Sequence, residues 1–202
     1  AANAKVVIVD YYYLFNESIR SSFLMKIKKD LENAIIIVDE AHNLPMRIRE
    51  LLTQKTSSQA IEYAKKEALK FGFNETIENL NILENALFEA GKNIEIEGTI
   101  SRNSLIDAIS GSKSYEDLMA ELSFIGEDIR DKQKKSFVLS VSKFLEAWLG
   151  SDIGYGRILA KEVDKKLRLM LSYRCLDPSI AAKEVIEKSY CTILMSGTLT
   201  PT

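Results

Sequence analysis

Three short apolar runs constrain the fold of this chain more than any other feature. They occupy residues 6–9, 34–38 and 191–195, and they are rich in β-branched side chains. Each run is too short for a typical helix and lacks the polar alternation of a half-solvated strand. Such runs are typical of strands that a parallel sheet covers on both faces. Residues 11–29 have loosely helical spacing and would connect the first two strands as a crossover.

The middle of the chain has a different pattern. Four apolar stripes at helical spacing predict helices that bury their apolar faces on one another, as in a small helical domain. Residues 93–110 predict a loop or short strand and then a brief helix. The stripes are Ile61, Ala64, Ala68 and Phe71; Ile77, Leu80, Leu83 and Leu87; Leu118, Leu122, Ile125 and Ile129; and Phe137, Val141, Phe144, Leu145 and Trp148. Ser114, with Asp117 three residues later, predicts the N-cap of the third helix.

The pattern changes again after the fourth stripe. Residues 157–163 and 167–173 alternate with period two around Asp164-Lys165-Lys166, which predicts a β-hairpin. A helix should follow over residues 177–188, with a proline near its start. We therefore expect an α/β fold, in which a partial parallel-sheet domain is interrupted by an all-helical insertion.

The predicted boundaries are 1–43 for the first part of the sheet domain, 44–155 for the insertion and 156–202 for the return. A length of 202 residues suits one domain interrupted by another. The net charge of −2 gives no overall basic field, although a local basic groove remains compatible with it. No apolar run approaches the roughly 20 residues of a membrane span, so no membrane partner is expected.

The residues with catalytic potential follow the second apolar run. Asp39, Glu40 and His42 would lie at the carboxyl end of a parallel strand, the edge at which open α/β sheets bind ligands. Asp39 suits Mg²⁺ beside nucleotide phosphates. Glu40 suits orienting or deprotonating an attacking water. His42, the single histidine, is a candidate relay. A plain turn or helix start is the alternative for an Asp-Glu pair, but the strand and the adjoining histidine favour a functional site.

A second motif follows the third apolar run. Ser196, Gly197 and Thr198 could form a tight, hydrogen-bonding turn. Parallel strands share a carboxyl edge, so we expect Asp39, Glu40 and His42 to lie close to Ser196 and Thr198. A distance of more than about 15 Å from His42 to Ser196 and Thr198, far beyond one water-bridged hydrogen bond, would contradict the split-domain interpretation.

The order and spacing of these motifs resemble the XPD/DinG branch of superfamily 2 DNA helicases. Asp-Glu-Ala-His at 39–42 resembles the Walker B (DEAH) box, and Ser-Gly-Thr-Leu with the following Pro201 resembles motif III. Residues 10–15 and 175–179 also resemble segments of that branch. The predicted insertion lies where those helicases carry their Arch domain.

This resemblance implies a RecA-like first motor domain and a role for each matching residue. Asp39 would hold Mg²⁺ through water, and Glu40 would bind the nucleotide and activate the attacking water. His42 would act with the coupling motif. That motif would comprise Ser196, Gly197 and Thr198. The cofactors would be ATP and Mg²⁺. Many members also carry a [4Fe–4S] cluster on four cysteines that Cys175 and Cys191 do not match.

The resemblance also implies a 5′-to-3′ DNA helicase that acts at junctions of single-stranded and duplex DNA, in DNA repair. Its partners would be single-stranded DNA and, through the insertion, repair or transcription-factor proteins. The location would be the cytoplasm of a prokaryote, which is preferred, or the nucleus of a eukaryote.

One departure from the family pattern limits this interpretation. No G-x-x-x-x-G-K-[ST] phosphate loop occurs in the chain, so it resembles a fragment that should not hydrolyse ATP alone. The alternative is a non-catalytic helical module that binds single-stranded DNA or a partner protein. An α/β hydrolase is disfavoured because no G-x-S-x-G elbow is present. Tyr11, Tyr12 and Tyr13 could stack on bases, but packing and hydrogen bonding beside the sheet are favoured.

Overall fold

The chain folds into two compact units. The computed structural model describes residues 4–163 and 167–197. Unit 1 comprises the described residues up to Thr53 and from Cys175 on, and unit 2 runs from Gln54 to Arg174. One unit thus interrupts the other, as the sequence indicated, but both boundaries lie later in the chain than predicted.

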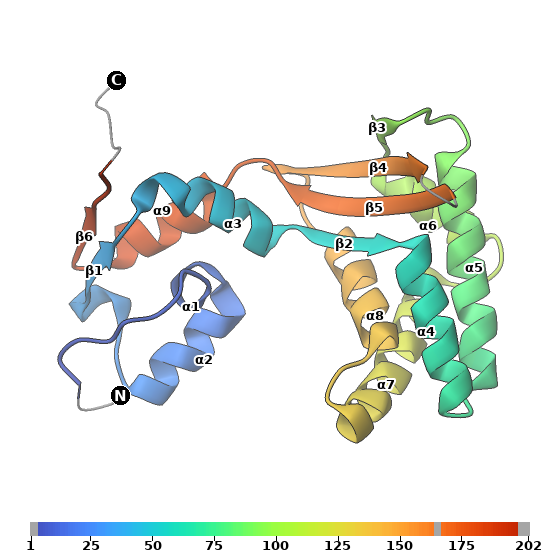
Figure 1. Cartoon of the computed structure of the whole chain (residues 1–202), viewed down its shortest axis with the longest axis horizontal. Coiled ribbons are helices and arrows are strands. Elements are labelled where there is room, and N and C mark those ends of the chain that lie inside the picture. Colours follow the sequence, from blue (N-terminus) through green and yellow to red (C-terminus); the bar gives the residue numbers. More distant parts are fainter. Residues whose placement is uncertain (1–3, 164–166, 198–202) are drawn as a thin grey trace. The chain divides into compact units, whose positions relative to one another are not determined.

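The sheet of unit 1 is a parallel pair of strands. β1 (Ile35–Val38) lies beside β6 (Cys191–Leu194), with Ile37 opposite Ile193 (Figure 1). Two segments about 150 residues apart in sequence are therefore neighbours in one sheet. This confirms the parallel α/β fold predicted from the two apolar runs.

In the sheet of unit 1, β1 is covered on one face only and β6 is largely exposed. Ile36 and Val38 are buried, whereas Ile35 and Ile37 are each 61% exposed. The prediction that these strands are buried on both faces is therefore wrong for the described residues. The buried face packs on a cluster of helical and loop side chains, which are Phe15, Leu31, Ala41, Leu44, Ile48 and Val185.

The predicted first strand, over residues 6–9, does not form. Val6 is 77% exposed and Ile8 is 93% exposed, and neither belongs to a strand. A strand needs a neighbour to pair its backbone N–H and C=O groups. None of the described strands lies beside this segment, so β-branched composition alone does not make it a strand.

Unit 1 also contains short helices. They are α1 (Tyr12–Phe15), α2 (Glu17–Ile27), α3 (Leu44–Leu52) and α9 (Ser179–Lys188), with 3-10 turns η1 (Leu31–Asn33) and η2 (Ala41–Asn43). Asn16 separates the first two helices, because its side chain accepts a hydrogen bond from the Ile19 amide and caps α2. The buried Arg20 pairs with Glu184 at 2.7 Å and so joins α2 to α9. Hydrogen bonds from Lys188 and Arg20 lower the pKa of the Glu184 carboxyl.

Helix α3 explains the shift of the first boundary. The prediction placed residues from 44 onward in the insertion. Leu44 and Ile48 instead pack in the core of unit 1 beside β1. The helix was not expected because its apolar stripe is short and follows Pro45, which stands in the first turn, where proline fits a helix.

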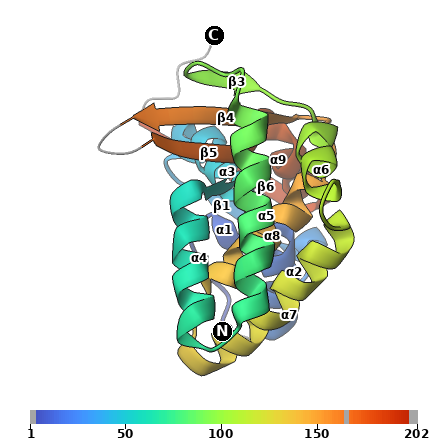
Figure 2. The same cartoon turned by 90° about the vertical axis from the view of Figure 1, so that its right-hand side faces the viewer.

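Unit 2 contains every helix that the four stripes predicted. The four stripes form α4 (Ser58–Lys70), α5 (Asn74–Gly91), α7 (Tyr115–Gln133) and α8 (Phe137–Trp148), and the brief helix predicted within residues 93–110 is α6 (Arg102–Ser110). Ser114 accepts a hydrogen bond from the Asp117 amide, which confirms the predicted N-cap of α7. Figure 2 shows α4 and α5 side by side, where Lys65 pairs with Glu84 at 2.7 Å. None of the helices in the described ranges combines the length and apolarity that crossing a membrane requires.

Unit 2 also contains a sheet, so the prediction of an all-helical insertion is wrong. Its four strands are β2 (Gln54–Ser57), β3 (Glu97–Thr99), β4 (Tyr155–Val163) and β5 (Leu167–Cys175), in the order β2-β5-β4-β3. β4 and β5 are the predicted hairpin strands, and the predicted turn at 164–166 lies outside the described residues. Because β2 and β3 pair with them antiparallel, the hairpin belongs to the insertion rather than to the parallel sheet.

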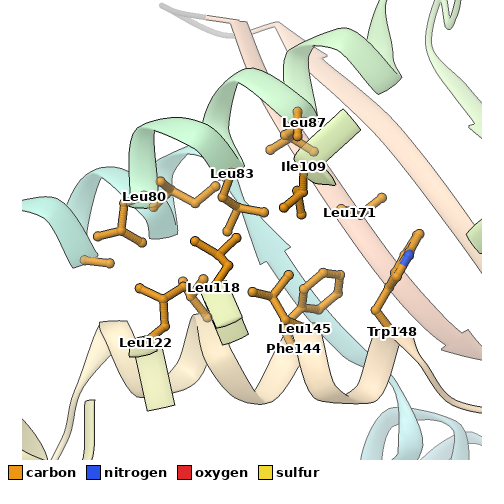
Figure 3. Close-up of a cluster of buried hydrophobic side chains, with 14 of the residues drawn as sticks. Leu80, Leu83, Leu87, Ile109, Leu118, Leu122, Phe144, Leu145, Trp148 and Leu171 are labelled. Atoms are coloured by element: carbon orange, nitrogen blue, oxygen red, sulfur yellow. The ribbon is translucent and has the colours of Figure 1, made fainter. Parts of the chain in front are cut away.

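A single core joins the helices and the sheet of unit 2. Figure 3 shows Leu118, Phe144 and Trp148 converging with leucines of α5 and with Leu171 of β5. The Trp148 side chain is fully buried. Since it is also the single tryptophan of the chain, its fluorescence reports the folding of unit 2 alone.

Gly126 of α7 lies tightly against the backbone of Leu139 in α8, and its substitution should destabilise unit 2. A Cβ at this position would lie 2.5 Å from the Leu139 amide nitrogen and 2.6 Å from its Cα. Gly126→Ala therefore forces the two helices apart, and we expect a loss of about 1–3 kcal/mol of unfolding free energy. Urea unfolding followed by Trp148 fluorescence measures this loss.

Gly111→Ala is the matched control for this substitution. The nearest atoms to a Cβ at position 111 are backbone oxygens at 3.9 Å, an ordinary contact distance. Its unfolding midpoint should stay close to that of the unmodified chain. Equal midpoints for the two variants would show that α7 and α8 can separate without cost.

The chain crosses between the units at two adjacent places. Within unit 1, the Thr53 hydroxyl accepts a 3.1 Å hydrogen bond from the Cys175 amide. Within unit 2, Gln54 pairs with Tyr173 at the end of the β2–β5 ladder. The two crossings are thus joined on both sides by hydrogen bonds, which is the arrangement that an inserted domain requires.

Candidate active site at the carboxyl edge of the parallel strands

The parallel ladder continues past the strands into both motifs. The Met195 amide donates to the Val38 carbonyl at 3.0 Å, and the Ala41 amide donates to the Met195 carbonyl at 3.0 Å. These bonds fix the first residues after β1 against the first residues after β6. The two motifs therefore meet at one edge of one sheet, as predicted from the shared direction of the strands.

Glu40 adopts a conformation that is uncommon for its residue type. Its φ of 49° and ψ of 44° lie in the left-handed region, which costs a residue with a side chain about 1–2 kcal/mol. The Glu40 amide donates to its neighbour Asp39 Oδ1 at 2.9 Å, and the Glu40 carbonyl accepts from the Asn43 amide at 2.9 Å. Local hydrogen bonds thus hold a sharp turn that brings the Glu40 carboxylate to the sheet edge.

The two motifs touch through side chains. His42 Nδ1 lies 2.6 Å from Ser196 Oγ and 3.2 Å from Glu40 Oε2, and the Ser196 hydroxyl donates to Glu40 Oε2 at 3.4 Å. A single hydroxyl proton cannot serve both the imidazole and the carboxylate. One arrangement that satisfies both contacts has Nδ1–H donating to Ser196 Oγ while the hydroxyl donates to Glu40.

This network is exposed, so its contribution to stability is small. The His42 side chain is 41% exposed and that of Glu40 is 58% exposed. Exposed pairs of this kind contribute roughly 0–1 kcal/mol. The contacts between the motifs therefore have little effect on folding, and they leave the polar atoms open to a ligand from solution.

A tyrosine outside both motifs also contacts the acidic box, residues 39–42. The Tyr11 hydroxyl donates a 2.5 Å hydrogen bond to the Asp39 carbonyl and lies 3.3 Å from the Glu40 carbonyl. The sequence favoured packing and hydrogen bonding beside the sheet for Tyr11 to Tyr13, but it did not connect Tyr11 with the box. Only the fold brings together residues 28 positions apart.

The predicted site residues that the structure describes lie together. Asp39, Glu40, His42 and Ser196 occupy one edge, Gly197 follows directly as an exposed residue, and Thr198 lies outside the described residues. The expected proximity of His42 and Ser196 is confirmed.

The donor set suits Mg²⁺ only with help from a nucleotide. Among residues 4–163 and 167–197, no three His, Cys, Asp or Glu side chains gather closely enough to hold a metal ion. Asp39 is exposed and offers carboxylate oxygens, one of which accepts a backbone hydrogen bond. Mg²⁺ is commonly held by one or two carboxylates, waters and substrate phosphates, so Asp39 fits a metal that arrives with a nucleotide.

Comparisons with known proteins agree with this geometry. The DEAD_2 family model matches residues 1–61, which include β1 and the acidic box. The ATP-dependent DNA helicase CHL1 of Yarrowia lipolytica is 25% identical over 98% of this chain, and that of Vanderwaltozyma polyspora is 27% identical over 98%. The structure of S. tokodaii Xpd4 superposes on 95% of the chain with a TM-score of 0.62, at 22% identity.

The resemblance to XPD-type superfamily 2 helicases is confirmed. The CHL1 sequence match and the Xpd4 structural match each extend over both units, because each covers nearly the whole chain. The chain spans 28% and 27% of the two curated relatives and 40% of the structural neighbour. The α/β fold with a parallel sheet and a helix-rich insertion is therefore an XPD-type fold.

Proposed function

We propose that this chain is part of an ATP-dependent DNA helicase and supplies the carboxylates that drive ATP hydrolysis. The observation that carries the proposal is the contact of Glu40 and His42 with Ser196 across the parallel strands. An acidic box alone could be a turn. A carboxylate and an imidazole that meet a second motif at the ligand-binding edge of a sheet fit a nucleotide site.

Each residue has a separate role in this proposal. Asp39 would hold Mg²⁺ through water, and Mg²⁺ bound there would supply positive charge beside the nucleotide phosphates. Glu40 would orient the attacking water and accept its proton as the water oxygen bonds to the γ-phosphorus and the bond from that phosphorus to the leaving ADP oxygen breaks. His42 and the coupling motif of Ser196, Gly197 and Thr198 transmit the nucleotide state to the part of the protein that moves DNA.

The units also have separate roles. Unit 1 is part of a RecA-like first motor domain, and unit 2 is an Arch-type insertion. We propose 5′-to-3′ movement on single-stranded DNA at duplex junctions, in DNA repair. Repair or transcription-factor proteins would bind through unit 2, and a [4Fe–4S] cluster would have its ligands elsewhere in a longer protein. The protein would be cytoplasmic in a prokaryote and nuclear in a eukaryote; the two CHL1 relatives described above are from yeasts.

The first test compares the 202-residue chain with a longer protein that contains it. The chain has no phosphate-loop motif, so alone it should show no ATPase activity with or without single-stranded DNA. The longer protein should hydrolyse ATP faster when single-stranded DNA is added, and should unwind duplexes with a 5′ overhang but not those with a 3′ overhang.

Three results would contradict parts of this proposal. DNA-stimulated turnover by the 202-residue chain would show that the nucleotide site is complete without a phosphate loop. Unwinding from 3′ overhangs would reverse the proposed direction. A longer protein that binds single-stranded DNA or a partner protein without hydrolysing ATP would be the non-catalytic helical module.

A further inference from the structure

The Tyr11 hydroxyl contacts the carbonyl oxygens of Asp39 and Glu40, which are separated by the φ and ψ bonds of Glu40. It lies 2.5 Å from the Asp39 oxygen and 3.3 Å from the Glu40 oxygen. In extended backbone, successive carbonyls point in opposite directions, whereas in helical conformations of either hand they point the same way. One hydroxyl can therefore reach both oxygens while Glu40 keeps its observed left-handed torsions, and it would lose one of them if Glu40 became extended.

These contacts act on a conformation that needs stabilisation. Glu40 is one of three non-glycine residues with positive φ among those the structure describes, and its conformation carries an intrinsic cost. The Asn43 amide stabilises the same turn from the C-terminal side through its bond to the Glu40 carbonyl. Tyr11 adds a contact from a different segment, so the turn does not depend on local bonds alone.

The ring and the hydroxyl of Tyr11 have different contacts. The half-buried ring packs against the core of unit 1. The hydroxyl points to the carbonyl oxygens of Asp39 and Glu40, and water could form a hydrogen bond with these oxygens in its absence. Replacing tyrosine by phenylalanine therefore removes the contact with the box while keeping the packing.

We propose that Tyr11 is a positioning residue that holds the Glu40 carboxylate in place through its main chain. The inference rests on the proposed function of Glu40 in ATP hydrolysis. Tyr11 does not touch the nucleotide. By favouring the left-handed turn, it raises the fraction of molecules in which the Glu40 carboxylate stands at the sheet edge beside His42 and Ser196.

Tyr11→Phe in the longer protein should lower kcat for ATP hydrolysis and leave the KM for ATP nearly unchanged. The loss of one hydrogen bond of average strength predicts roughly a fivefold fall in kcat. Tyr190→Phe is the matched control, because Tyr190 is 76% exposed and precedes β6 at the opposite end of the strand from the site. Its kcat should be that of the unmodified protein.

The mechanism has a readout in the 202-residue chain that does not involve ATP. Tyr11→Phe should speed hydrogen exchange of the Asn43 amide roughly fivefold, because that amide is protected by its bond to the Glu40 carbonyl. Glycine adopts the left-handed conformation without the steric cost. In a Glu40→Gly background, the same tyrosine change should therefore speed exchange less than about twofold.

Each outcome decides between the two proposals. Faster exchange at Asn43 together with a fall in kcat supports positioning by Tyr11. Unchanged exchange, or a kcat equal to that of Tyr190→Phe, overturns the positioning role and leaves the proposed function standing if Glu40→Gln still stops hydrolysis. If Glu40→Gln hydrolyses ATP normally, the proposed function fails, and the positioning role fails with it.

Discussion

Replacing Glu40 by glutamine in the longer protein should reduce ATP turnover by roughly 100-fold or more, the range expected when a general base is removed. Glutamine keeps the length and hydrogen-bonding capacity of the side chain but cannot accept the proton of the attacking water. Nucleotide binding should persist, because Asp39, the proposed metal-binding residue, is unchanged. Steady-state hydrolysis and the Kd for a non-hydrolysable ATP analogue measure the two effects separately.

Glu50→Gln is a closely matched control for this change. The Glu50 side chain is 58% exposed, the same fraction as that of Glu40, and it lies on α3 of the same unit in a pair with Arg47. It removes the same charge but not the proposed base. If Glu40→Gln hydrolysed ATP as fast as Glu50→Gln, the acidic box would be a structural turn.

Replacing His42 by alanine should uncouple ATP hydrolysis from DNA unwinding in the proposed motor. The imidazole connects the Glu40 carboxylate to Ser196 at the end of the other strand. Without it the carboxylate can still accept a proton, so ATP hydrolysis should fall about twofold or less. Unwinding should fall about tenfold, the size expected when a functional contact worth roughly 1.4 kcal/mol is lost. Parallel assays of ATP consumed and base pairs opened give the coupling ratio.

Ser196→Ala and Arg47→Ala complete this experiment. If His42 acts through the serine, Ser196→Ala should lower the coupling ratio to the same degree, and the double variant should be no worse than either single one. Arg47 is also exposed and lies on α3, so its removal should leave the ratio unchanged. Equal losses of hydrolysis and unwinding in His42→Ala would refute a coupling role and indicate a general disturbance of the site.

The parts of the fold that follow from local patterns were predictable. Apolar periodicity identified the helices of unit 2, and the continuous apolar runs identified β1 and β6 and their parallel direction. Patterns failed where pairing partners decide the outcome. Residues 6–9 have strand composition but no described neighbour, whereas β2 (Gln54–Ser57) is polar and forms a strand because β5 offers it a backbone ladder.

In the candidate site, too, some features were predictable from the sequence and others depended on the fold. The meeting of His42 and Ser196 was predictable, since parallel strands end at a common edge. The left-handed turn at Glu40 was not, because no glycine or asparagine marks it in the sequence. The contact from Tyr11 was not predictable either, because it depends on how α1 packs beside the strands. Functional residues that lie in short motifs could thus be identified from the sequence, whereas contacts from distant residues could be identified only from the fold.

The adjacent crossings between the units have a consequence for evolution. The Thr53 hydroxyl accepts a hydrogen bond from the Cys175 amide, so the two positions at which unit 2 is inserted into unit 1 lie side by side. A different module with neighbouring termini, or a short turn, could join the same positions without altering the pairing of β1 with β6. Changes in the sequence or length of the insertion therefore need not alter the pairing of β1 with β6, which positions the carboxylates at the sheet edge.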